Sequence, residues 1–278
     1  VTTKFIVHAG LAAVYVDDGT TRTDVTGTAP TGAIDDRWTG GTLNGIFVCN
    51  NGKDVPMYWV GTIATNLATL PGWDANWRAE SLRPFKNSLV AMNITKSGTK
   101  YPHMVKVSDL ANPGAVPASW DSTDPTIDAV EQDQEGSDPL VDGLQLGDAF
   151  ILYKERSCIA MTFIGAPYLY RYQRLPGAFG MLARGCAVDT PLGHVVLSAG
   201  DVVLNAGNGP VSICNGAVRK YIFNNINSTH YKRAFVTSNP SRDEVWVCFP
   251  FGSAEACDRA AVWNWTDKTW SIRTLVNA

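Results

Sequence analysis

Short runs of β-branched and aromatic residues that end in turn residues recur along the whole chain. Six such runs share one form, an apolar strand that leads into Gly, Asn, Asp or Ser, and they occupy residues 12–19, 45–52, 88–98, 149–157, 194–201 and 244–252. Nowhere does a helical spacing of apolar residues persist for more than about two turns. The pattern therefore predicts an all-β chain in which each run is a strand that enters a hairpin turn.

The six runs follow one another at a nearly regular distance. Between central residues 14, 47, 90, 151, 196 and 246 the steps are 33, 43, 61, 45 and 50 residues, with a mean of about 46. Such a period is typical of propeller blades made of four antiparallel strands. One small sheet cannot bury both of its faces alone, so we expect about six four-stranded blades in a single β-propeller domain over residues 1–278. Because the chain begins with Val1 rather than Met, we expect it to be part of a longer chain.

A tryptophan-rich stretch near the end of the sequence fits the same scheme. Residues 261–265 and 270–275 are predicted to be two strands of the sixth period, joined by a turn at residues 266–269. Strand alternation places Trp263 and Trp265 on one face. Such rings could stack a ligand, but the repeat favours packing between blades. We therefore predict that both rings belong to the core.

An acidic, proline-bounded segment lies at residues 125–143. It contains six carboxylates and no Lys or Arg, and the six are Asp128, Glu131, Asp133, Glu135, Asp138 and Asp142. This composition predicts a solvated loop between blades. The segment lacks the alternating carboxylates and the glycine of a calcium loop, so we assign no metal ligand to it.

The bulk composition narrows the classes of function. A formal charge of −3 argues against a protein that binds by neutralising nucleic-acid phosphates. The six cysteines are spread along the chain and mostly flanked by strand residues, which predicts reduced core thiols rather than a disulfide framework. No apolar window approaches the length that a membrane-spanning helix needs.

The sequence contains none of the catalytic motifs that can be tested from one chain. It has no G-x-S-x-G, no H-E-x-x-H, no phosphate loop and no dinucleotide fingerprint. The four histidines are far apart, and His194 is expected to be an ordinary strand residue. Two opposed carboxylates could still make a propeller a glycoside hydrolase, and residues 265–271 faintly resemble the aspartate box of sialidases without its glycine. We predict a protein that is not an enzyme, with no catalytic, cofactor-binding or metal residue.

Two stretches, 168–174 and 219–235, interleave basic and aromatic residues. Such a combination can stack nucleic-acid bases. In the first stretch, however, alternation places the three tyrosines on one face and Arg171 on the other. This arrangement favours a blade edge or a subunit contact, with nucleic-acid binding as the alternative.

Several long phrases resemble the tail tubular, or nozzle, protein of short-tailed bacteriophages of the podovirus type. They occupy residues 76–94, 142–165, 179–226, 239–250 and 257–278. Residues 1–60 match this family only in their strand-and-turn rhythm. The chain is much shorter than such proteins and lacks clear channel and tip segments.

The resemblance implies a structural virion protein of the phage tail, assembled in the bacterial cytoplasm. Proteins of this kind form a ring, typically a hexamer, below the head-to-tail connector, and they help to hold the tail fibres. The ring closes the tail channel before infection and lets phage DNA pass afterwards, without sequence-specific binding. The alternatives are a receptor- or glycan-binding propeller module of the tail and a glycoside hydrolase. The resemblance implies no cofactor and no membrane anchor.

Overall fold

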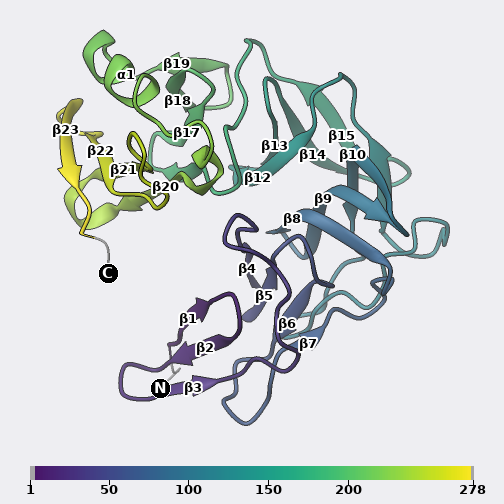
Figure 1. Cartoon of the computed structure of the whole chain (residues 1–278). Coiled ribbons are helices and arrows are strands. Elements are labelled where there is room, and N and C mark those ends of the chain that lie inside the picture. Colours follow the sequence, from purple (N-terminus) through teal and green to yellow (C-terminus); the bar gives the residue numbers. More distant parts are fainter. Residues whose placement is uncertain (1–3, 277–278) are drawn as a thin grey trace. The chain divides into compact units, whose positions relative to one another are not determined.

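The computed structural model describes residues 4–276 and is all-β apart from one short α-helix and two 3₁₀ turns (Figure 1). The strands form six antiparallel sheets, three in each of two compact units, Val1–Ser137 and Asp138–Ala278. Within every sheet the strands follow one another in chain order, so each sheet is a series of hairpins. These sheets are the blades of the predicted β-propeller. A single domain over residues 1–278 stays a prediction.

The first unit contains three sheets. They consist of β1 (Ile6–Ala9), β2 (Val14–Asp17) and β3 (Arg22–Asp24); of β4 (Thr39–Leu43), β5 (Ile46–Asn50), β6 (Met57–Trp59) and β7 (Ala68–Thr69); and of β8 (Trp77–Phe85), β9 (Ser88–Lys96), β10 (Thr99–Val107) and β11 (Val130–Asp133).

The second unit contains three four-stranded sheets and the helix. The sheets consist of β12 (Leu140–Leu146), β13 (Ala149–Lys154), β14 (Cys158–Gly165) and β15 (Leu169–Arg174); of β16 (Ala187–Thr190), β17 (Gly193–Ser198), β18 (Asp201–Asn205) and β19 (Pro210–Ser212); and of β20 (Phe235–Asn239), β21 (Glu244–Phe249), β22 (Arg259–Asn264) and β23 (Thr269–Thr274). The helix is α1 (Gly216–Phe223), and the 3₁₀ turns are Tyr231–Arg233 and Pro240–Arg242.

Each of the six recurrent runs forms the second strand of its sheet, namely β2, β5, β9, β13, β17 and β21. In a four-stranded blade this strand has a hydrogen-bonded neighbour on either side, and both faces of the sheet are covered by packing. All six residues of β17 are buried, as are the first seven of β9. Doubly covered strands need nearly continuous apolar runs, which is why the repeat is visible in the sequence.

The first sheet has three described strands rather than the four expected of a blade. After β3 the chain runs from Val25 to Trp38 without a strand. This segment contains Gly27, at φ +66°, and Pro30, which lacks an amide donor. Both features oppose an extended hydrogen-bonded edge.

In the first unit, the second and third sheets pack closely through β4 and β8. A Cβ on Gly41 would lie 2.9 Å from the ring of Pro84, so a residue without a side chain lets the strands approach. The Thr39 hydroxyl accepts a hydrogen bond from the Leu82 amide at 3.1 Å, and the Asn50 side chain donates to the Ala79 carbonyl at 2.9 Å. Polar groups therefore connect the sheets beside their apolar core.

In the second unit one apolar core runs through all three sheets. Tyr153 on β13, Val196 on β17 and Val247 on β21 are almost fully buried within it. The helix adds Ile222 to the same core. Its N-terminus is capped by the Asn215 side chain, which accepts a hydrogen bond from the Val218 amide at 2.9 Å. The helix has eight residues, about two turns, which agrees with the absence of any longer helical spacing of apolar residues in the sequence.

The cysteine prediction is confirmed, since all six are free thiols and five of them are buried. Cys257 is half-buried, and its thiol contacts the Arg233 carbonyl at 3.1 Å. Among the described residues, no helix has the length and apolar character needed to cross a membrane.

Candidate functional site

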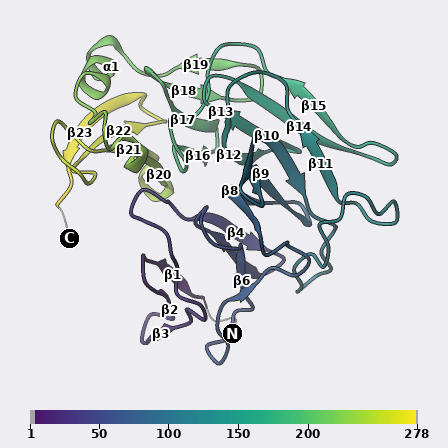
Figure 2. The ribbon, with the colours of Figure 1, turned by 45° about the vertical axis from the view of Figure 1, so that its right-hand side comes forward.

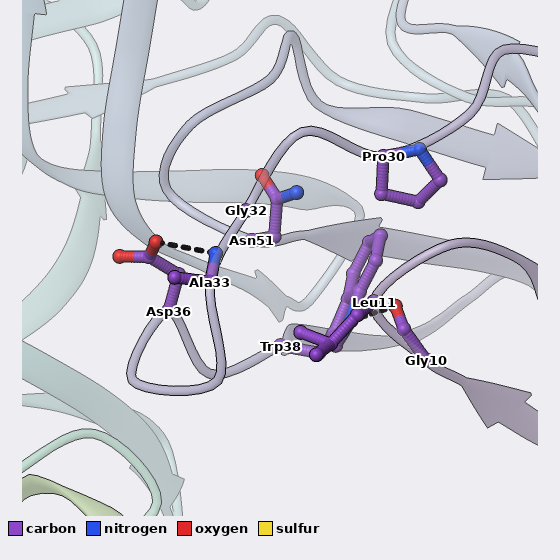
Figure 3. Close-up of a pocket in the computed structure, with 8 residues that line it drawn as sticks. All are labelled: Gly10, Leu11, Pro30, Gly32, Ala33, Asp36, Trp38 and Asn51. Carbon is purple, nitrogen blue, oxygen red and sulfur yellow. Dashed lines mark hydrogen bonds between the residues drawn. The ribbon is translucent and has the colours of Figure 1, made fainter.

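A shallow pocket that is open to solvent lies in the first unit (Figure 3). It is lined by Gly10, Leu11, Pro30, Gly32, Ala33, Asp36, Trp38 and Asn51. The residues come from the turn after β1, from the strandless segment between β3 and β4, and from the end of β5. Small-molecule sites usually measure about 300–1,000 Å³, whereas this pocket encloses no space for even one water molecule, so it is not shaped to hold a ligand.

The polar groups around this pocket are engaged with the protein itself. Asp36 accepts from the Ala33 amide at 2.8 Å and lies 3.5 Å from the Lys53 ammonium. The Trp38 indole donates to the Gly10 carbonyl at 3.1 Å, and the Asn51 amide donates to Asp54 at 2.6 Å. The arrangement stabilises a loop. None of these residues was predicted from the sequence to be part of a site. The content of glycine and proline between β3 and β4 is the feature that could have indicated a folded loop there.

Asp54, next to the pocket, is also a structural carboxylate. Burial alone would raise its pKa, but hydrogen bonds from Thr31 and Asn51 and the charge of Arg78 outweigh burial and lower the pKa. The Thr31 amide and hydroxyl both donate to Asp54, at 2.9 and 2.5 Å. Asp54 therefore stays ionised at neutral pH and fastens the loop.

His194 belongs to a buried hydrogen-bond chain between two sheets of the second unit. Its Nε2–H donates to the Gln145 carbonyl at 2.8 Å, so Nδ1 accepts from the Tyr153 hydroxyl at 2.9 Å. The Asn205 side chain donates to the same hydroxyl at 2.9 Å. Burial lowers the pKa of His194 and raises that of Tyr153. The histidine is thus a neutral strand residue, as predicted, and in addition connects β12, β13, β17 and β18.

This burial predicts a loss of stability in mild acid. An unfolded histidine binds a proton near pH 6.5, whereas folded His194 stays neutral at that pH. Because the unfolded state then holds more protons, the free energy of unfolding should fall as pH drops from about 6.5 towards the lowered pKa, by at most about 1.4 kcal/mol per pH unit. Urea titrations at several pH values measure the slope.

The matched control for this prediction uses a histidine that is exposed. His194→Gln should flatten the pH dependence, while His8→Gln should leave it as in the wild type, because His8 is exposed on β1. An unchanged slope in His194→Gln would show that another group is responsible.

Two lysines, a glutamate and a tryptophan form a second cluster, in the first unit. Glu131 accepts from Lys96 at 2.5 Å and from Lys106 at 3.0 Å. The two ammonium groups lie 4.6 and 4.9 Å from the centre of the Trp77 ring. Burial lowers the pKa of Lys106, a shift that often marks functional sites. The four side chains come from β8, β9, β10 and β11 of one sheet, so the geometry of the cluster is that of a structural ion-pair network.

The prediction that residues 125–143 form a solvated loop is wrong for four of the six acidic residues, since Glu131, Asp133 and Asp142 lie on strands and Asp138 pairs with a buried lysine. Glu131 lies on β11 and pairs with two lysines, Asp138 lies 3.4 Å from the fully buried Lys154, and Asp142 on β12 is itself fully buried. Asp142 accepts from the amides of Gly143 and Gly185. The lysines that pair with Glu131 and Asp138 and the Gly185 amide that donates to Asp142 lie outside the segment, so local composition did not indicate them.

The prediction for the tryptophans is confirmed. Trp263 and Trp265 are 3% and 9% exposed and belong to the core of the second unit. Trp270, across the hairpin, has its ring centre 6.4 Å from that of Trp263. Its indole donates to the carbonyl of Ile213, the residue after β19 of the preceding sheet, at 2.9 Å. The rings therefore join blades and leave no stacking platform.

The basic and aromatic stretches are placed differently from each other. The first contains β15, the outer strand of its sheet, as the edge-strand interpretation predicted. The second contains most of α1, where Arg219 holds Asp201 through two nitrogens at 3.2 and 2.9 Å.

No group of three or more His, Cys, Asp or Glu residues that could hold a metal ion occurs in the described part of the chain. The stretch similar to an aspartate box forms the β22–β23 turn, where the amides of Thr266 and Asp267 donate to the Asn264 side chain. Its chemistry is that of a tight hairpin.

Comparison with known proteins leads to a fold and not to a family. No protein-family model and no curated protein matches this sequence. Among 110 solved chains that match in fold, one is a protein from Bacteroides uniformis that is provisionally described as a 6-phosphogluconolactonase. It superposes with a TM-score of 0.56 at 10% sequence identity, over 93% of this chain and 77% of that one. At this identity the chain is similar to that protein in fold alone.

Proposed function

We propose that the chain is a non-catalytic structural module of a short bacteriophage tail, a component of the nozzle or tail tubular ring. The observation that supports this proposal is that the side chains most suited to chemistry or binding are engaged in contacts within the protein. His194, Lys106 and Trp263, which could have served chemistry or binding, instead hold strands and sheets together. A rigid scaffold needs such contacts, and the long phrases that resemble nozzle proteins favour this kind of scaffold.

In this role the full-length protein forms a hexameric ring that contacts the head-to-tail connector and the tail fibres. Phage DNA passes through the channel without sequence-specific binding. A net charge of −3 suits a conduit along which a polyanion slides. Free thiols suit assembly in the reducing bacterial cytoplasm.

The test is the position of the chain in the virion. An epitope tag inserted after Gly98 lies in the β9–β10 turn, where an added Cβ would meet nothing within 4 Å. Gold-labelled antibody on purified virions of the encoding phage should mark the short tail below the connector, with untagged virions as the control. Label on the capsid or only on the distal fibres, or absence of the chain from virions, would overturn the proposal.

An assay of the full chain tests the non-catalytic part separately. We expect no hydrolysis of 6-phosphogluconolactone or of host polysaccharide above the buffer rate, and no glycan retained on an array. Turnover that one carboxylate substitution abolishes would replace the structural role by an enzymatic one. Saturable binding of one glycan would favour the receptor-binding alternative.

A further inference from the structure

The hairpin between β14 and β15 extends beyond its own sheet. β13 pairs with β14 only as far as Thr162, whereas β14 and β15 go on to pair Phe163 with Tyr170 and Gly165 with Leu169. The two strands lie side by side in both ribbon views (Figures 1 and 2). Residues 163–170, the hairpin tip, therefore form a two-stranded ribbon without a third strand beside β14.

The hairpin tip exposes large apolar side chains. Phe163, Ile164 and Tyr168 are 37%, 51% and 78% exposed, and no residue of the tip is charged. A single exposed apolar residue is ordinary on a protein surface. Three at one projecting turn form a patch of the kind that marks an interaction surface.

Positive charge lies directly behind the tip. From Ser157 to Val188 the sequence contains three arginines and no acidic residue, although the whole chain is acidic. Arg171 and Arg174 are exposed on β15, and neither has an ion-pair partner within the described residues. Arg171 pairs with Thr162, one position behind the tip.

The dimensions of the hairpin match a lipid interface. Three residue pairs of a strand span roughly 10 Å, and interfacial segments bury their apolar side about 5–10 Å into the boundary between headgroups and acyl chains. With the tip at that depth, Arg171 lies at the level of the lipid phosphates. Tyrosine is a preferred side chain at this interface, because its ring is apolar and its hydroxyl is polar.

We propose that the hairpin tip binds the surface of an anionic phospholipid bilayer. Phe163, Ile164 and Tyr168 enter the headgroup boundary, Arg171 contacts lipid phosphates, and Arg174, three residues farther from the tip, adds positive charge above the surface. A groove on a partner protein would also accept the apolar tip. The bilayer is favoured because the two arginines behind the tip have no ion-pair partner in the described part of the chain, and Arg171 lies at the depth of the lipid phosphates.

One acidic residue near the arginines allows a substitution that should strengthen binding instead of weakening it. Asp148 is exposed in the turn before β13, and the next residue, Ala149, pairs with Thr162, which in turn pairs with Arg171. Two strand spacings, roughly 10 Å, thus separate Asp148 from Arg171. Its charge opposes anionic lipid, so Asp148→Asn should strengthen binding.

The experiment is cosedimentation of the full chain with phosphatidylglycerol vesicles and with phosphatidylcholine vesicles. Binding is expected only to the anionic vesicles and should weaken as salt screens the arginines. Ile164→Ser with Tyr168→Ser should weaken it at least about tenfold. Arg171→Gln should weaken it about fivefold, and Arg174→Gln should weaken it less because that charge lies farther from the surface.

Val211→Ser is the matched control, because Val211 is 61% exposed on β19 of the same unit and should not affect vesicle binding. Thermal melts of all variants should coincide with that of the wild type. Absence of wild-type binding, or binding that the tip variants leave unchanged, would overturn the proposal. So would self-association that depends on the tip but occurs without vesicle binding. These outcomes do not depend on where the chain lies in a virion, so failure here is distinct from failure of the tail assignment.

Discussion

Replacement of Trp263 by alanine is expected to lower the free energy of unfolding by about 3–5 kcal/mol. The side chain is 3% exposed and packs in the core formed by β13, β17, β21 and β22. Its removal would leave a cavity beside Trp270, whose own hydrogen bond to the Ile213 carbonyl restricts its movement into the space. Urea or thermal unfolding, followed by tryptophan fluorescence and circular dichroism, measures the loss.

Ile272→Ala is the control for this substitution. Ile272 lies on β23, the outer strand of the same sheet, and is 40% exposed. Its truncation should change stability by no more than about 0.5 kcal/mol. If Trp263→Ala unfolds at the same denaturant concentration as the wild type, the ring does not hold these sheets together.

Replacement of Glu131 by alanine is the second change with a large expected effect, again about 3–5 kcal/mol. The substitution removes the carboxylate that pairs with both Lys96 and Lys106. Lys106 is 2% exposed, so its ammonium would be left in a poorly hydrated site next to a second positive charge. The same unfolding measurements apply.

The pair of Lys100 and Glu80 offers a matched exposed control in the same sheet. Their nitrogen and oxygen are 3.2 Å apart, but the side chains are 55% and 35% exposed. Glu80→Ala should therefore cost no more than about 1 kcal/mol. In contrast, Lys106→Met combined with Glu131→Leu should recover most of the stability, because an apolar pair leaves no buried charge. Equal losses from Glu80→Ala and Glu131→Ala would contradict the ion-pair explanation.

Acid should weaken the same cluster. Burial alone would raise the pKa of Glu131, but the hydrogen bonds and charges of Lys96 and Lys106 lower it below its ordinary value of about 4.5. Its contribution to stability is thus present above about pH 4.5 and is lost as pH falls through the lowered folded pKa. The loss from Glu131 begins near pH 4.5 and that from His194 near pH 6.5, so the two effects have different onsets in one pH series.

Much of the fold could be predicted from local patterns. The six apolar runs were found because strands covered on both faces need continuous hydrophobic sequence, and all six are second strands of their sheets. The strands around Trp263 were predicted because alternation and a turn follow from neighbouring residues alone. The missing fourth strand after β3 was not predicted, because the regular spacing of the second strands does not depend on the outer ones.

The polar contacts could not be predicted in this way. His194 was expected to be a strand residue, but its partners Tyr153, Gln145 and Asn205 are distant in sequence. The hairpin tip was likewise only a tyrosine-rich edge strand until the pairing of β13 with β14 was seen to stop at Thr162.

The sequence by itself determined the second strand of each sheet, the number of repeats and the burial of the tryptophans, since each depends on residues close together along the chain. Only the tertiary structure decided which charges are neutralised. Lys106 meets Glu131 from 25 residues away, and Asp142 meets Gly185 from 43. Ion pairs and buried hydrogen bonds act over a few ångströms in space, and that distance is set by how sheets pack, not by local composition.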